Sequence, residues 1–206
     1  KNRDWEDIAL GPGPGSTNLI YIGDIGDNYG QQKVKKIYCV EEPAIDFDGE
    51  LPVIFALTVK MSDRPRDTEA LMVDPWSKNI YLITKREKKV HLYEIKFPFT
   101  QDTLKAERLK SLPMHQVVAA DISADGTEVL VKTYDRIFYW TRLSHESIPD
   151  ALAKDPVELP YQREGMGESI AWARDGSGFY TLGENAKGKR APLYFYKRLK
   201  QDTIKR

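Results

Sequence analysis

The sequence has little of what several common classes of protein require. It contains a single cysteine, Cys39, which excludes an internal disulfide framework and a cysteine-based metal cluster. No apolar run approaches the roughly 20 residues that a membrane-spanning helix needs. The 31 basic and 31 acidic residues cancel, so no overall field would attract nucleic acid or an anionic membrane surface. Any charged ligand must therefore be met by a local cluster of side chains.

Helical periodicity is also scarce. The one helix candidate covers 144–154, and Pro149 limits it to a turn or two. Elsewhere apolar and polar residues alternate over short stretches, and the chain has 14 glycines and 12 prolines. This pattern predicts an all-β protein built from many short strands.

An internal repeat organises these strands. Each of four segments opens with an acid followed by small and apolar residues, and the acids are spaced 63, 52 and 47 residues apart. A turn, a second strand and a third strand follow in the same order, and three segments add a more polar fourth strand. The second strands are expected at 19–24, 80–85, 129–134 and 179–184.

This spacing matches one four-stranded blade per repeat and predicts a β-propeller, with blades at roughly 4–61, 67–112, 119–161 and 166–206. An antiparallel sandwich with accidental self-similarity is the alternative. Because propellers usually need more than four blades to close, we expect a single domain that belongs to a longer, five- or six-bladed ring.

The acids that open the repeats are candidate metal ligands. In a propeller the innermost strand of each blade lines the central channel, so we expect these acids at the channel mouth. Several carboxylates on one axis favour a hard cation such as calcium, and the 23–28 loop (GDIGDN) adds two more. The predicted calcium ligands are Glu6, Asp24, Asp27, Glu69, Asp121 and Glu168. Alternatively, each acid accepts hydrogen bonds from backbone N–H groups or pairs with Lys85 or Lys132, and the ring needs no metal.

Basic residues fall on the same predicted face. Arg64 and Arg66 flank Pro65 immediately before the second repeat, and guanidinium groups there would clamp a phosphate or carboxylate. His115 is the only histidine expected on that face. The predicted ligand-binding residues are Arg64, Arg66, Lys85, His115 and Lys132. No Gly-x-Ser-x-Gly elbow, phosphate-binding glycine loop or dinucleotide fingerprint is present.

Two resemblances support the predicted fold. The stretches 3–9 (RDWEDIA), 21–28 (YIGDIGDN) and 37–43 (IYCVEEP) resemble a family of uncharacterised bacterial β-propeller proteins that are often exported. That resemblance implies a secreted or periplasmic location and no particular activity. More distantly, 67–74 and 167–171 are similar to inner strands of calcium-dependent phytase-like and esterase-like propellers. Their glutamates hold calcium, which implies Glu69 and Glu168 as metal ligands, with Glu6 and Asp121 by repeat symmetry.

Two functional hypotheses follow. The first is an exported propeller with calcium at the channel mouth, which would hydrolyse a phosphate ester or a lactone with metal-activated water and a carboxylate base. The second is a non-catalytic propeller that binds a small molecule or a protein on the channel face. Nucleic acid and a membrane span are not expected, and the sequence does not determine the oligomeric state.

Overall fold

The structure is a computed structural model that describes residues 3–15, 17–184 and 190–199. Its strands follow one another in four groups, which we number blades 1 to 4. Blade 1 contains β1 (Trp5–Pro12), β2 (Asn18–Asp24), β3 (Lys35–Glu41) and β4 (Phe55–Met61). Blade 2 contains β5 (Thr68–Val73), β6 (Ile80–Thr84), β7 (His91–Ile95) and β8 (Leu104–Ser111). Blade 3 contains β9 (Val117–Ile122), β10 (Glu128–Thr133), β11 (Ile137–Thr141) and β12 (Val157–Leu159), and blade 4 contains β13 (Gly167–Trp172), β14 (Gly178–Gly183) and β15 (Leu193–Lys197).

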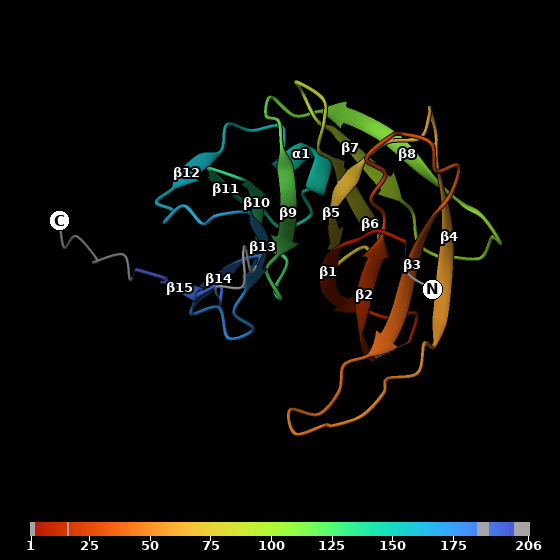
Figure 1. Cartoon of the computed structure of the whole chain (residues 1–206), viewed down its shortest axis with the longest axis horizontal. Helices are drawn as coiled ribbons and strands as arrows, with labels where there is room; N and C mark the ends of the chain where they lie inside the picture. Colours follow the sequence, from red (N-terminus) through yellow and green to blue (C-terminus); the bar gives the residue numbers. More distant parts are fainter. Residues whose placement is uncertain (1–2, 16, 185–189, 200–206) are drawn as a thin grey trace.

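Each blade is an antiparallel meander whose first strand is innermost. Figure 1 shows β1, β5, β9 and β13 gathered toward the middle of the molecule, with β4, β8 and β12 on the outside. In addition, β4 pairs in parallel with β8 through Val59 and Leu104 and the two residue pairs that follow, which joins blades 1 and 2 into one eight-stranded sheet. This arrangement is a β-propeller, and the fold class predicted from the repeat is confirmed.

Local sequence accounts for the turns and for the short helix. The Asp-Gly hairpins place Gly126 at φ +75° and Gly176 at φ +69°, a conformation that glycine adopts without steric cost. The predicted helix is reduced to α1 (Ile148–Ala151), where Ser147 caps the N-terminus and Pro149 stands in the first turn. No helix in the described part of the chain is long and apolar enough to cross a membrane.

The blades stack through alternating faces. On each second strand, successive side chains point to opposite neighbours, so Leu82 packs toward blade 1 while Tyr81 packs toward blade 3. Three apolar clusters result, one in each interface between consecutive blades. Fully burying a leucine or a similar side chain contributes about 1.5–3 kcal/mol, so each of these interfaces stabilises the packing of one blade on the next.

Two aspartates connect the inner strands. Asp7 Oδ2 accepts hydrogen bonds from the backbone N–H of Leu71 in blade 2, at 2.8 Å, and of Ala120 in blade 3, at 3.4 Å. Asp121 Oδ2 accepts from the N–H of Trp172 in blade 4 at 2.7 Å. The innermost strand has no neighbouring strand on its channel side, and these carboxylates satisfy backbone donors that a sheet would otherwise pair.

We expect Asp121→Ala to lower the free energy of unfolding by about 1–3 kcal/mol, because a backbone donor inside the ring loses its acceptor. Urea denaturation of the purified chain measures this difference. The matched control is Asp102→Ala, which removes an exposed aspartate in the loop before β8. Equal losses in the two variants would show that Asp121 does not connect blades 3 and 4.

Candidate functional site

The first strand of every blade carries a β-bulge at the same place. In β1 the pairing with β2 skips Glu6, in β5 it skips Glu69, and in β13 it skips Glu168. A bulge re-aims the extra side chain and is common beside functional sites. Three glutamates from three blades are thereby directed to one end of the channel. In β9 the bulged residue is Val118, which has no acid to contribute.

Asp121 is therefore misaligned in the sequence repeat. The register of β9 against β10 places Val118, three residues earlier, at the position of Glu6, Glu69 and Glu168. Asp121 instead faces the inside of the ring and accepts hydrogen bonds from the N–H groups of Trp172 and Ile122. Its removal from bulk water raises its pKa to about 7, against the opposing effect of these two donors.

The three glutamates border one cavity of about 790 Å³ at the channel mouth, which we call the mouth cavity. Lys85 lines this cavity and directly follows the second strand of blade 2. Its Nζ is 2.9 Å from Glu69 Oε2 and 3.7 Å from Glu168 Oε1. The same ammonium lies 5.0 Å from the centre of the Tyr134 ring, a cation–π contact. The residues that line the cavity are Glu6, Asn28, Glu69, Lys85, Arg86, Glu87, Lys88, His115, Gln116, Tyr134, Met166, Glu168 and Glu184.

All four blades meet in this cluster. Glu6 comes from blade 1, Glu69 and Lys85 from blade 2, Tyr134 from blade 3 and Glu168 from blade 4. Tyr134 donates its hydroxyl proton to Glu168 Oε1 and so connects blades 3 and 4 above the channel. A ligand in the mouth cavity can therefore contact every blade at once.

Burial and neighbouring charges raise the pKa values of Glu6, Glu69 and Lys85. Burial raises the pKa of Glu6, and the neighbouring carboxylate of Glu69, with which it shares a hydrogen bond, raises it further. Burial also raises the pKa of Glu69, although the Lys85 ammonium opposes that effect. Burial alone would lower the pKa of Lys85, but its contacts with Tyr134 and Glu69 outweigh burial and raise it. The Glu6–Glu69 pair therefore retains a proton near neutral pH, while Lys85 stays charged.

The backbone around the cavity is strained. Gln116 and Met166, which both line it, have φ values of +55° and +54°, in the left-handed region that non-glycine residues rarely adopt. A side chain at Gly26 would displace the carboxylates of Glu6 and Asp4, so the small size of glycine leaves the bulged glutamate of blade 1 in its place. Strain of this kind persists where the surrounding structure enforces it, and functional sites are the commonest place.

The two aspartates of the 23–28 loop accept hydrogen bonds from backbone N–H groups and do not line the mouth cavity. Asp24 accepts a hydrogen bond from the N–H of Asp4 at 2.8 Å. Asp27 accepts from the N–H groups of Gln31 and Gln32 at 2.8 and 2.9 Å. Both carboxylates are buried in these turns, and neither borders the mouth cavity.

Of the predicted ligand-binding residues, Lys85 and His115 line the mouth cavity and the others do not. Arg64 is exposed on its loop. Arg66 is buried in ion pairs with Asp63 and Glu87. Lys132 has no exposed surface and donates to the backbone carbonyl of Gly167 beside Glu164, where burial lowers its pKa to about 8.

The sequence pattern missed Tyr134 and Glu184 as cavity residues. Each of them directly follows the second strand of its blade, the position that Lys85 occupies in blade 2. Comparing residues at that repeat position would have found both. The bulges leave no signal in the sequence, because they depend on how two strands pair.

The arrangement of these acids bears on the predicted calcium site. Among the described residues, no group of three or more His, Cys, Asp or Glu side chains has the proximity needed to hold a metal ion. The ammonium of Lys85 already supplies the positive charge beside Glu69 and Glu168. Calcium binding by these acids stays a prediction from the sequence, and so does the metal-free alternative.

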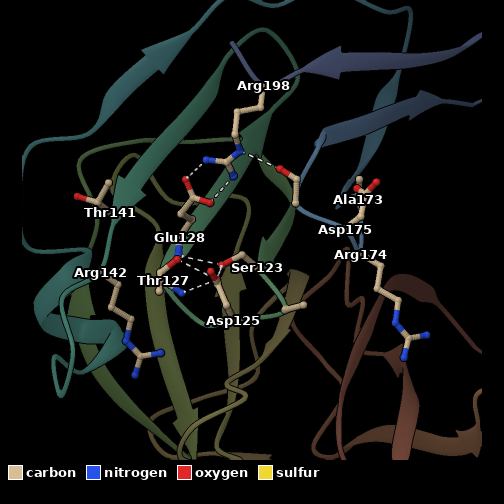
Figure 2. A pocket seen from close by; sticks show the side chains of 12 residues that line it. Ser123, Asp125, Thr127, Glu128, Thr141, Arg142, Ala173, Arg174, Asp175 and Arg198 are labelled. Carbon is tan, nitrogen blue, oxygen red and sulfur yellow. Dashed lines mark hydrogen bonds and ion pairs between the residues drawn. The ribbon is translucent and has the colours of Figure 1, made fainter. Parts of the chain in front are cut away.

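A second cavity, of about 530 Å³, lies at the opposite end of blades 3 and 4 (Figure 2). Its charged side chains already have partners within the protein. Arg198 forms an ion pair with Glu128, and Asp125 accepts hydrogen bonds from Ser123 and Thr127 within its own turn. Arg142 reaches Asp74 at 2.6 Å, and Arg174 reaches Glu42 at 2.8 Å. This cavity is a meeting point of hairpin turns held by ion pairs, and the mouth cavity is the better candidate site.

We expect the stability of the wild-type chain to fall as pH rises from about 5 to 9, relative to that of Glu6→Gln. The folded state holds the Glu6 proton more tightly than the unfolded chain, because burial and Glu69 raise its pKa. Rising pH removes the proton first from the unfolded chain and so favours unfolding. Urea midpoints across this range measure the difference, with Glu184→Gln as a control that lines the same cavity. Parallel curves for wild type and Glu6→Gln would contradict the shared proton.

The comparisons with known proteins support the fold and no more. The sequence matches no protein-family model, and the search of curated proteins gives no match. Among solved structures, hydrazine synthase from Kuenenia stuttgartiensis aligns over 92% of this chain and 45% of its own, with 12% identity and a TM-score of 0.50. The periplasmic gluconolactonase PpgL of Pseudomonas aeruginosa aligns over 96% of this chain and 58% of its own, with 12% identity and a TM-score of 0.48. The Dos1 propeller aligns over 87% and 40%, with 13% identity and a TM-score of 0.46. The chain thus spans about half the length of these three solved chains. The resemblance of its first 43 residues to a family of exported bacterial propellers stays a prediction.

Proposed function

We propose that this propeller binds a small polar molecule in the mouth cavity without a metal ion. One observation carries the proposal: all four blades deliver charged or hydroxyl-bearing side chains to one cavity, and three of those side chains stand on β-bulges. A packed channel would need no such arrangement. The strained backbone at Gln116 and Met166 supports the same conclusion, since its cost must be compensated elsewhere in the fold.

The chemistry of the cavity defines the ligand class. The carboxylates of Glu69 and Glu168 accept hydrogen bonds, whereas Lys85 and the protonated carboxyl of the Glu6–Glu69 pair donate them. Donors and acceptors of this kind suit a molecule with several hydroxyl groups and one carboxyl, lactone or phosphate group. At about 790 Å³, the cavity has the size of an ordinary small-molecule site.

Hydrolysis of an ester or a lactone is the second candidate. It is favoured by the pairing of a carboxyl that keeps its proton, Glu6, with a carboxylate held next to an ammonium, Glu69. Two carboxyl groups whose pKa values are pushed apart can act as general acid and general base. In this form of the proposal Lys85 would stabilise negative charge on the carbonyl oxygen, and calcium would not be required. Export to the periplasm or beyond stays a prediction from the resemblance.

The proposal is tested by thermal unfolding in the presence of gluconate, glucono-lactone, sugar phosphates, calcium and EDTA, each added separately. A ligand that binds the native state raises the unfolding midpoint by mass action. We expect a rise with at least one hydroxylated acid, lactone or phosphate, and loss of that rise in Glu69→Gln and Lys85→Met. The control is Lys89→Met, which removes an exposed lysine of the same loop that does not line the cavity.

Two results would decide against this reading. A midpoint that rises with calcium, falls with EDTA and no longer responds in Glu69→Gln would replace it with the calcium hypothesis. Rises that persist unchanged in both Glu69→Gln and Lys85→Met would move the binding site elsewhere. Release of product from the lactone or the phosphate ester would show that the protein is a hydrolase and not only a binding protein.

A further inference from the structure

The outer faces of blades 1 and 4 have the composition of blade interfaces, yet they are exposed. The third-strand position that faces the next blade is held by Ile37, Leu92 and Ile137 in blades 1 to 3, all with 0% exposure. Leu193 holds that position in blade 4 and is 64% exposed. The side chain at this position is isoleucine or leucine in all four blades, but only in blades 1 to 3 does a following blade bury it.

The face of blade 1 that points away from blade 2 also exposes an apolar side chain that other blades bury. Its inner-strand position is held by Ile8 in blade 1, Leu71 in blade 2 and Ile170 in blade 4. Leu71 and Ile170 are 0% and 5% exposed because the preceding blade covers them, whereas Ile8 is 60% exposed. Single exposed apolar side chains are ordinary, but a repeated interface position without its partner is not.

The two faces form the walls of one groove of about 440 Å³, which we call the blade groove. Its apolar lining comes from both sides: Trp5, Ile8 and Ile22 from blade 1, and Tyr180, Leu182 and Leu193 from blade 4. At the far end Arg174 of blade 4 reaches Glu42 of blade 1 at 2.8 Å, so the walls approach each other without packing.

We propose that the blade groove is the docking surface for one further propeller blade, contributed by a polypeptide segment outside residues 3–199. The three interfaces within the chain show what such a wall accepts: a sheet whose alternate side chains are apolar on both faces. Tight curvature of the ring favours a single blade, because β1 already contacts β9 and Asp7 reaches the N–H groups of both blade 2 and blade 3.

The docked blade also completes the candidate site, and this part of the inference rests on the proposed function. Glu6 lines both the blade groove and the mouth cavity. An inner strand inserted between β1 and β13 would therefore run next to Glu6 and beside the strand that carries Glu168. The added blade would supply a further wall to the cavity, and ligand affinity would rise when it docks.

The exposed walls are tested first on the 206-residue chain itself. Light scattering after gel filtration gives its mass, and fluorescence of the dye ANS reports exposed apolar surface. We expect a monomer whose ANS signal falls in Leu193→Asp with an unchanged unfolding midpoint. Leu143→Asp is the matched control, because Leu143 is 69% exposed in a loop outside the groove. Ile137→Asp, at the same repeat position inside an interface, should lower the midpoint strongly.

Two outcomes of this experiment overturn the proposal. A dimer that Leu193→Asp dissociates would make a second copy the occupant of the groove. A monomer without ANS fluorescence, in which Leu193→Asp lowers the midpoint as Ile137→Asp does, would mean that blades 1 and 4 close directly on each other.

A longer version of the chain supplies the missing blade. Residues 115–165, which contain blade 3, are repeated after residue 206 through a flexible glycine and serine linker. We expect the appended blade to abolish the ANS signal and to raise the unfolding midpoint. The same appended copy carrying Val131→Asp, on the face that must pack against blade 4, should do neither. An unchanged ANS signal with the intact copy would contradict the proposal, and none of these readouts depends on the ligand of the mouth cavity.

Discussion

Every blade of this protein must bury both faces of its sheet, and the rest of the structure follows from that constraint. Strand geometry directs successive side chains to opposite faces, so the second and third strands of blades 2 and 3 each contribute to two apolar clusters at once. The third-strand position that faces the next blade is apolar in all four blades, including Leu193 of blade 4, which no further blade of the described residues covers. Stacking around an axis satisfies the constraint for consecutive blades and leaves it unmet at the two ends of the series.

The inner strands face a different requirement, because they border a channel instead of another strand. Asp7 and Asp121 meet it by accepting backbone donors from the next blades. The bulges of β1, β5 and β13 then free one residue per strand from pairing, and in each case that residue is a glutamate. Structural acids and candidate functional acids thus share the same strands but occupy different positions on them.

In the mouth cavity, a lysine supplies positive charge beside two of the glutamates that the sequence predicts as calcium ligands. Lys85 lies between glutamates of blades 2 and 4 and beside the tyrosine of blade 3, so a single ammonium joins three blades. It balances only part of the negative charge, and the remainder is relieved by a proton on the Glu6–Glu69 pair. Under the proposed function, the fixed ammonium would bind a polar ligand and the exchangeable proton would be available for transfer.

The sequence alone determined the strand content, the repeat and the fold class, because these depend on local alternation and on turn residues such as Gly126 and Gly176. The predicted second strands lie within one residue of the observed ones, since each is a short apolar run bounded by polar turns. The sequence also placed Glu6, Glu69, Glu168, Lys85 and His115 on the expected channel face, and all five line the mouth cavity, while their metal- and ligand-binding roles stay predictions. Only the tertiary structure decided that Asp121, Asp24 and Asp27 accept hydrogen bonds from backbone N–H groups. It also decided that Lys132 is buried. Strand register and the approach of one blade to the next set those roles, and neither is encoded in the local pattern of residues around an acid.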